Sequence, residues 1–412
     1  MGMSLWDLDP GKLPGPLGKL GKKELHLWVG AWLKDRLKKR RMEQAQHAQE
    51  GTRHLLFAVC DHYEPLHGQG TTTANAKVDA AAMDKARARV ATWRTEYPKL
   101  GKFRDSTGRP PRHSFFYPGE QYYPDLVEPV AELCEAGFGE VEVHLHHDND
   151  TREALRASLD ETLTNYEKHG LVPRVNGKRA WAFIHGNWCL ANARRDRRYC
   201  GVDDEMQLLY DLGCYADFTF PSAPDESQPG IVNAIYYPAG DVTKRRAYER
   251  GEPARVGTAK QDRLLMIEGP LALAMRPHSN KIRIESAALD WADPPNWSRL
   301  RTWVRQRIVV EGRPDWVFVK VHTHGAPEKN AEIMLGGRNV ELHEELAKKY
   351  NDGKAWKLHY VSAREMYNVA RAAMDGKTGS PDAWFDYEVP RPPRLATARA
   401  ATASAAASSA AK

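Results

Sequence analysis

Three segments of this chain have the pattern of a β-strand and then end in a dense set of aspartate and histidine residues. They are Phe57–Pro65 (FAVCDHYEP), Glu140–Asp150 (EVEVHLHHDND) and Trp316–Gly325 (WVFVKVHTHG). Apolar or alternating runs of this kind are typical of strands, and polar residues that follow parallel strands gather at one rim of an α/β sheet or barrel. Because packing alone does not explain histidines at three strand ends, the chain is expected to fold so that these ends meet.

Strand and helix patterns alternate from residue 52 to about residue 375, which predicts an α/β fold with a parallel, closed or nearly closed sheet. We expect this domain to cover residues 51–376, with a long loop at about residues 221–262 near the site. Residues 1–50 would form a flexible leader and a basic amphipathic helix. Residues 377–412 are low in complexity and would form a disordered tail.

Charge and cysteine usage exclude some classes of function. The net charge is only +6, and the densest basic run is confined to residues 34–41. A nucleic-acid-binding domain spreads basic residues over a face, so no nucleic-acid partner is expected. The five cysteines form no CxxC pair, which favours reduced thiols. With no apolar run long enough to span a bilayer and no signal-peptide pattern, the sequence predicts a cytoplasmic protein.

Residues 25–42 have a helical pattern with Trp28 and Trp32 on the apolar side and a basic cluster at the C-terminal end. Basic charge at that end suits the helix dipole, so an ordinary helix packed on the domain is one interpretation. The other is an interfacial helix that binds anionic lipid. This second interpretation predicts that the protein is membrane-associated, with peripheral membrane contact through residues 25–42.

The alternating strand places Glu140, Glu142, His144 and His146 on one face. His144 and His146 are two residues apart, so their Cα atoms lie about 7 Å from each other and both side chains can reach one metal ion. His146 and Asp150 can converge on the same ion through the loop that follows. The alternative is a polar edge strand in contact with water.

The other two strand ends carry similar residues. Asp61 and His62 follow an apolar strand, and both can face a pocket only if the strand ends or bulges there. His322 and His324 repeat the spacing of two, and either is a candidate general acid or ligand. The alternatives are a helix-capping aspartate beside a surface histidine, and two histidines exposed in a loop.

A further strand ends in His185-Gly186-Asn187-Trp188. Its glycine allows close approach of a ligand to the backbone, its asparagine can bind hydroxyl groups, and its tryptophan offers a flat face for a sugar ring. An equally good interpretation is a tight turn with a packed tryptophan.

In order and spacing, these motifs resemble the polysaccharide deacetylase-like superfamily, whose members are carbohydrate esterases on an irregular (β/α)7-type barrel. The family's first strand ends Phe-Asp-Asp-Gly, and Val59-Cys60-Asp61-His62 stands in that place. The family's His-x-x-x-His motif matches residues 146–150, with Asp150 at the second histidine. Val321-His322 matches the late Leu-His motif. The Asp and one His of the family's ligand set thus exchange places.

The resemblance implies a role for each matched residue. It gives His62, His146 and Asp150 as ligands of a divalent metal ion, Zn²⁺ by its donor set. Asp61 would be the catalytic base and His322 the general acid. His144, His147 and His324 would orient the ligands from outside or serve as alternative ligands. The remaining candidates would bind substrate: His185, Asn187, Trp188, Tyr122 and Tyr123.

The function expected from the resemblance is metal-dependent removal of an acyl group, N-acetyl in the leading hypothesis, from a saccharide or polysaccharide. Three alternatives stay open. One is an amidohydrolase-like metallohydrolase with two metals. Another is a metal-free glycosidase with Asp61 and Asp150 among its carboxylates. The last is a catalytically inactive barrel that binds glycan in polysaccharide biosynthesis.

Overall fold

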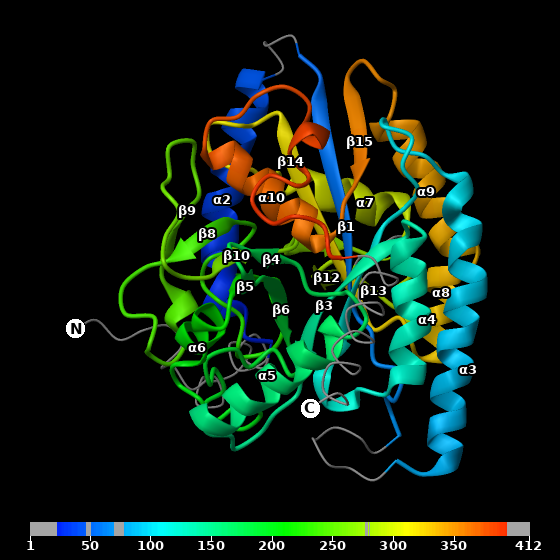
Figure 1. Ribbon diagram of the computed structural model, residues 1–412. Coiled ribbons are helices and arrows are strands. Elements are labelled where there is room, and N and C mark those ends of the chain that lie inside the picture. Colours follow the sequence, from blue (N-terminus) through cyan, green and yellow to red (C-terminus); the bar gives the residue numbers. More distant parts are fainter. Residues whose placement is uncertain (1–22, 47–50, 70–77, 277–278, 280, 394–412) are drawn as a thin grey trace.

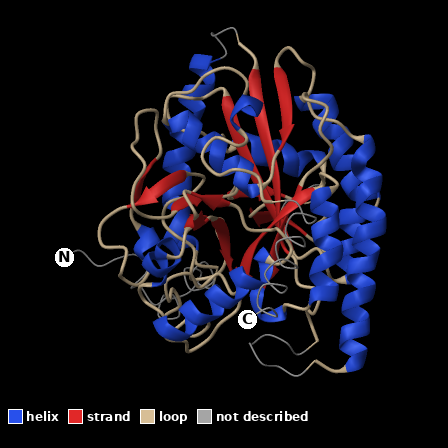
Figure 2. Cartoon of the chain, viewed as in Figure 1, coloured by secondary structure: helices blue, strands red, loops and turns tan. Residues whose placement is uncertain are grey.

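The computed structural model of this protein describes residues 23–46, 51–69, 78–276, 279 and 281–393. Its centre is a large, mostly parallel β-sheet with helices packed around it (Figure 1, Figure 2). The predicted α/β class is therefore confirmed. Most of the expected leader (residues 1–22) and most of the expected tail (residues 394–412) lie outside the described residues.

The main sheet has 11 strands in the order β13-β14-β1-β2-β3-β6-β7-β10-β8-β9, with β15 also paired to β1. The pairs β10–β8 and β8–β9 are antiparallel, and the other pairs of this sheet are parallel. The strands are β1 (Arg53–His62), β2 (His113–Pro118), β3 (Gly139–Leu145), β6 (Trp181–His185), β7 (Cys214–Asp217), β8 (Ile235–Pro238), β9 (Gly251–Pro253), β10 (Leu265–Ile267), β13 (Ala288–Leu289), β14 (Trp316–Thr323) and β15 (Trp356–Tyr360). Two small hairpins lie outside this sheet: β4 (Arg174–Val175) with β5 (Lys178–Arg179), and β11 (Ala272–Met275) with β12 (Ile282–Glu285).

The sheet curls strongly, because residues of distant strands touch. Lys320 on β14 donates from Nζ to the carbonyl oxygens of Phe218 (2.5 Å) and Phe220 (2.7 Å), just beyond β7. Four strands lie between β14 and β7 in the sheet order. A flat sheet would hold these groups far apart, since neighbouring strands are about 4.8 Å from each other.

The two ends of the sheet order, β13 and β9, are not joined by a strand ladder in the part of the chain that the structure describes. Residues 308–311 lie between them. The Phe318 N–H donates to the Ile308 carbonyl at 2.8 Å, and the Glu311 N–H donates to the Ala254 carbonyl at 2.8 Å. This segment therefore links β14 to the chain that follows β9.

Helices surround the sheet on its outer side, apart from α10, which packs on the inner face. They are α2 (Leu25–Gln46), α3 (Ala80–Glu96), α4 (Pro124–Glu135), α5 (Arg152–Glu167), α6 (Glu205–Asp211), α7 (Trp297–Arg305), α8 (Glu328–Leu335), α9 (Gly337–Tyr350) and α10 (Ala363–Met374), with 3₁₀ turns η3 (Tyr97–Lys102), η4 (Gly119–Gln121), η5 (Ala247–Glu249) and η6 (Pro381–Trp384). Helices α3, α4, α8 and α9 stand along one side of the molecule (Figure 1).

Strand β1 shows how the core is divided. Leu55, Phe57 and Val59 pack into a cluster with residues of α3, α4 and α5. The alternate residues Leu56 and Ala58 pack into a second cluster with side chains of β6, β7, β10 and α10. Because both faces of β1 are buried, its sequence is a continuous apolar run, as expected for a central parallel strand.

Two expected boundaries are corrected by the structure. Residues 221–262, expected to form a long loop, contain β8 and β9, and β8 pairs with β10. The β-favouring residues Ile235, Tyr236 and Tyr237 form this strand despite the surrounding turn residues. The expected tail does not begin at residue 377, since Phe385 and Val389 are buried against α10.

Helix α2 packs on the domain. Trp28 is fully buried beside Val232 and Leu271, and the Trp32 indole donates to Gln306 Oε1 at 3.2 Å. Lys39 is also buried and donates to the Asn233 carbonyl at 2.9 Å. The two tryptophans are thus engaged within the domain, and contact of α2 with lipid remains a prediction. No helix among the described residues is both long enough and apolar enough to cross a membrane.

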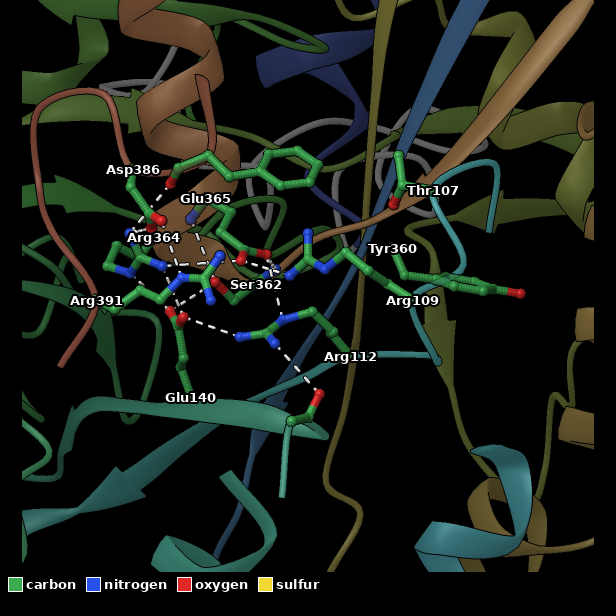
Figure 3. Close-up of polar contacts among 12 residues, drawn as sticks. Thr107, Arg109, Arg112, Glu140, Tyr360, Ser362, Arg364, Glu365, Asp386 and Arg391 are labelled. Carbon is green, nitrogen blue, oxygen red and sulfur yellow. Dashed lines mark hydrogen bonds and ion pairs between the residues drawn. The ribbon is translucent and has the colours of Figure 1, made fainter. Parts of the chain in front are cut away.

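A buried ion-pair network fixes the N-terminal ends of β2 and β3 to α10 (Figure 3). Glu140, at the start of β3, accepts from Arg364 at 2.8 and 3.0 Å, from Arg112 at 2.9 Å and from the Ser362 hydroxyl at 2.6 Å. Arg112 also lies 3.2 Å from Glu365. Burial by itself raises the pKa of Glu140, but Arg364 and Arg112 outweigh it and hold the pKa at about 2.

We expect Glu140→Gln to lower the free energy of unfolding by about 3–5 kcal/mol at neutral pH, because it removes the buried carboxylate that two buried guanidinium groups share. The pKa of Glu140 falls on folding from 4.5 to about 2. Its contribution is therefore complete above about pH 4.5 and is lost as the pH falls toward 2. Urea denaturation at several pH values measures both effects.

The matched control is Arg391→Ala, which removes the exposed ion pair with Asp386. It should change the free energy of unfolding by less than about 1 kcal/mol. Equal effects of the two substitutions would contradict the role given to Glu140.

Candidate metal centre

The histidines predicted at three strand ends do meet at the carboxyl ends of β1, β3 and β14. The ring of His62 lies 4.8 Å from that of His144, 4.6 Å from that of His324 and 6.3 Å from that of His322, measured between centroids. The ring of His146 lies 4.6 Å from that of His144. They converge because β14, β1, β2 and β3 are successive in the sheet and parallel.

Glu64, two residues beyond β1, stands at the centre of these rings. Its Oε1 lies 3.2 Å from His144 Nε2, 3.7 Å from His146 Nε2 and 3.8 Å from His324 Nε2. Its Oε2 lies 2.6 Å from Nδ1 of His67. His62, Glu64 and His144 each offer one ligand atom within 4.8 Å of the others. A carboxylate among imidazoles is a suitable donor set for Zn²⁺ or another borderline divalent ion.

The outer nitrogens of two rings have acceptors that decide where the protons lie. His144 Nδ1 is 2.8 Å from the Ile184 carbonyl oxygen, and His146 Nδ1 is 2.6 Å from Glu120 Oε1. A carbonyl only accepts, so His144 Nδ1 carries hydrogen and in the neutral ring its Nε2 lone pair faces Glu64. Histidines that bind metals are oriented in this way by a carbonyl or carboxylate behind the ring.

If His144 is neutral, its Nε2 lone pair points at the Glu64 carboxylate, and a cation between the two groups removes their repulsion. His62 adds to this pattern, because its buried Nδ1 has no hydrogen-bond partner among the described residues. Buried polar atoms are rarely left in this state. A divalent cation bound by His62, Glu64 and His144 satisfies both requirements, and His146 is within reach to complete the set.

The protonation of the groups fits cation binding. Burial raises the pKa of Glu64, but hydrogen bonds with His144 and His67 outweigh it and hold the pKa well below its usual range. Burial, and then the neighbouring histidines 324, 144 and 322, hold the pKa of His62 well below its usual value. At neutral pH the site therefore contains an ionised carboxylate and a neutral imidazole, which are the forms that bind metal.

Asp61, the predicted base, lies on the opposite face of β1 from His62. Its Oδ1 accepts from the Gly325 N–H at 2.6 Å, and its Oδ2 is 2.8 Å from Nε2 of His113. The carboxylate is fully buried beside the helix layer. Gly325 is required here, because a Cβ atom at this position would lie 2.2 Å from Asp61 Oδ2. These contacts suit a residue that positions the loop of His324, and the catalytic role of Asp61 remains a prediction.

Asp150, the third predicted ligand, lies beside His147. Its Oδ2 is 3.4 Å from His147 Nδ1, and its Oδ1 accepts from the Thr151 N–H at 2.8 Å. The structure thus brings His62 and His146 together around Glu64 but places Asp150 at the outer edge of a second group of side chains. Asp61 contacts Gly325 and His113, whereas Asp150 contacts His147 and Thr151, so the two carboxylates have separate partners.

A cavity of about 450 Å³ adjoins the centre and is lined by Glu120, Tyr122, His146, His147 and Asp150. Of the predicted substrate-binding residues, Tyr122 lines this cavity, and its hydroxyl is 2.9 Å from Nε2 of His169. Tyr123, Asn187 and Trp188 are half-buried. His185 is fully buried and belongs to the group beside Asp150.

Gly186 has a different role from the predicted one. A Cβ atom at this position would lie 2.4 Å from Cδ2 of His146. The glycine therefore admits the ring of His146 against the backbone after β6, which is how this ring reaches Glu64.

Glu64 and Glu120 were not among the residues predicted from the sequence. Glu64 lies within Asp61-His62-Tyr63-Glu64 and shares the alternation of His62, so extending the strand pattern by one step could have found it. Glu120 lies in η4, a turn between β2 and α4. Nothing in its local sequence indicates that it faces a histidine of β3.

Comparisons of the chain with family models, with curated proteins and with solved structures find no match. The resemblance to deacetylase-like proteins therefore depends on the motifs alone.

We expect Glu120→Gln to weaken divalent metal binding about 10–100-fold, the usual effect of removing an outer carboxylate from a ligating histidine. Competition with a chelating dye measures the affinity. Glu161→Gln is the matched control, since Glu161 is exposed at the same cavity, and it should bind metal as the wild type does. Equal affinity of the Glu120 variant and the wild type would remove His146 from the ligand set.

Proposed function

We propose that this protein is a metal-dependent hydrolase that removes an acyl group, in the simplest case N-acetyl, from a saccharide. The observation that carries the proposal is the Glu64 carboxylate, which faces Nε2 of three histidines while acceptors behind His144 and His146 fix the orientation of their rings. His62, Glu64 and His144 would hold a divalent ion, Zn²⁺ by donor type. When bound, such an ion polarises an acyl carbonyl and lowers the pKa of a bound water.

Access to the centre favours catalysis over a purely structural role. Glu64 and His144 are buried, but the side chain of His324 is 30% exposed and that of His67 is 47% exposed. A catalytic metal site keeps one position open to water or substrate, whereas a structural site is closed by protein ligands. The open side therefore provides a path for the acyl group.

His322 is the proposed proton carrier. Its buried Nδ1 has no hydrogen-bond partner among the described residues, and it lies on the same side of β14 as His324. Burial, and then the charge of Lys320, hold the pKa of His322 well below its usual value, so the ring starts neutral. A neutral imidazole can take a proton from the attacking water and pass it to the departing amine.

The saccharide is proposed from the lining of the 450 Å³ cavity, which combines Tyr122 with Asp148, Ser158 and Asn165. Hydroxyl-rich ligands need such a mixture of an aromatic edge and many hydrogen-bonding groups. We also propose that the curled sheet is an irregular barrel of the deacetylase-like kind. The contact of Lys320 with the end of β7 and the link through residues 308–311 support this proposal.

The alternative with two catalytic metals meets a specific difficulty. Among the described residues, two groups could hold a metal, His62–Glu64–His144 and His147–His185–Cys200–Glu205, and they share no residue. Paired catalytic ions lie about 3.5–4 Å apart and act on the same bond. Two separate ligand sets favour one catalytic ion and one with another role.

The proposal predicts that Glu64→Gln loses both the metal of this centre and acyl hydrolysis, because the central anion is removed. Release of acetate from N-acetylated amino sugars and their oligomers, with metal content measured on the same samples, tests this. Glu332→Gln, an exposed change on α8, should leave both unchanged. Metal binding without hydrolysis of any acylated sugar would instead favour a glycan-binding barrel.

A second pair of variants separates the proton carriers. His322→Gln should keep the metal and lower kcat about 10²–10⁴-fold, the usual contribution of acid–base catalysis. If Asp61 positions the loop of His324, Asp61→Asn should lower thermal stability and keep part of the activity. An intact, stable Asp61→Asn protein with no turnover would instead establish the predicted role of Asp61 as base.

A further inference from the structure

A second group of metal-binding side chains lies beside the proposed catalytic centre and is not used by it. His147, His185, Cys200 and Glu205 each offer one ligand atom within 4.8 Å of the others, and all four residues are buried. They come from the ends of β3 and β6, from the loop that follows β6 and from the first residue of α6.

The distances within this group match those between ligands of one tetrahedral ion. Glu205 Oε1 lies 3.0 Å from His147 Nε2 and 3.6 Å from His185 Nε2, and Glu205 Oε2 lies 3.4 Å from Cys200 Sγ. Zinc bonds of about 2.0–2.3 Å in tetrahedral geometry place neighbouring ligand atoms about 3.3–3.8 Å apart. The side chains therefore need only small shifts to bind one ion.

The surroundings hold three of the four ligands in place. The Ala191 N–H donates to Glu205 Oε2 at 2.6 Å, and Asp150 Oδ2 lies 3.4 Å from His147 Nδ1. His185 Nε2 is buried and has no hydrogen-bond partner in the part of the chain that the structure describes. The Asn187 N–H approaches His185 Nδ1 at 3.3 Å. When the ring binds a metal through Nε2, its proton lies on Nδ1 instead, so this long contact is lost and Nε2 gains a metal–nitrogen bond.

The loop that these ligands enclose explains why an ion is needed there. Residues 186–204 join β6 to α6 without a helix or strand. Five residues of this loop that are not glycine have positive φ: Trp188, Ala191, Asn192, Arg197 and Tyr199. Such backbone is unfavourable for side chains other than glycine and persists only where surrounding contacts fix it. His185 lies at one end of the loop, and Cys200 and Glu205 lie at the other.

We propose that His147, His185, Cys200 and Glu205 bind a structural Zn²⁺ ion that closes the loop of residues 186–204 onto the sheet. A set of four protein ligands, buried on every side, is typical of structural zinc rather than of a catalytic ion, which keeps an open position. The proposal is independent of hydrolysis at Glu64.

Cobalt substitution tests the site directly on the full chain. The protein is stripped with a chelator and titrated with Co²⁺, and we expect a thiolate-to-cobalt charge-transfer band in the near ultraviolet that saturates by two equivalents, one for each proposed site. Cys200→Ser should lose the band, while Cys189→Ser, a buried cysteine outside the group, and Glu64→Gln should keep it. A wild-type spectrum without the band, or a band that persists in Cys200→Ser, overturns the proposal.

Proteolysis tests the closing of the loop without a variant. Arg197 and Arg198 are exposed within it, at 62% and 60% of their side-chain surface. We expect trypsin to cut after these residues in the stripped protein and to cut several-fold more slowly after two equivalents of Zn²⁺, enough for both proposed sites, are restored. An equal rate of cleavage with and without Zn²⁺ would show that no ion holds this loop.

Discussion

The arrangement of this site depends on one buried carboxylate. Glu64 is ionised although its side chain is almost fully buried, and buried ionised groups persist only when opposite charge or several hydrogen bonds surround them. The ends of β3 and β14 supply the imidazole rings of His144, His146 and His324 at 3.2–3.8 Å from Glu64 Oε1. Because a neutral His144 donates its one N–H to the Ile184 carbonyl, that ring does not neutralise this anion. A bound cation does.

Strand β3 also carries buried polar side chains that have specific partners, on the face turned toward the inner side of the sheet. Each polar residue there meets a specific partner at its own level: Glu140 meets Arg364 and Arg112, and Glu142 accepts from the Tyr215 hydroxyl at 2.6 Å. Burial is the main reason that the pKa of Glu142 rises to about 7. His144 follows at the rim. Glu140, near the start of β3, fixes the strand to α10. His144, near its end, is therefore held with little freedom, as a preorganised site requires.

Much of this arrangement could be predicted from the sequence, because it follows from strand periodicity. Alternation along Glu140–Leu145 predicted His144 on one face, and the apolar run of β1 predicted a buried strand, which the structure extends through Asp61 to His62. The choice of ligands could not be predicted in the same way. Asp150 and His146 are close in sequence, but the turn after β3 directs them to different groups, and Glu120, Cys200 and Glu205 approach from turns whose paths depend on tertiary contacts. The motif resemblance also favoured Asp61, whereas strand alternation turns it toward the helices.

The two groups of ligands have opposite relations to solvent, and this difference assigns their roles. Around Glu64 the partly exposed rings of His324 and His67 leave one side accessible, so a water or an acyl oxygen can reach an ion held there. Around Glu205 all four ligands are enclosed, so an ion there can only hold the chain together. His185 of the second group also contacts the Asn187 N–H at 3.3 Å, and Asn187 and Trp188 are the residues predicted from the sequence to meet a sugar. A loop with five strained residues holds a tryptophan in a fixed position only if its ends are anchored, and the enclosed group provides that anchor beside the open one.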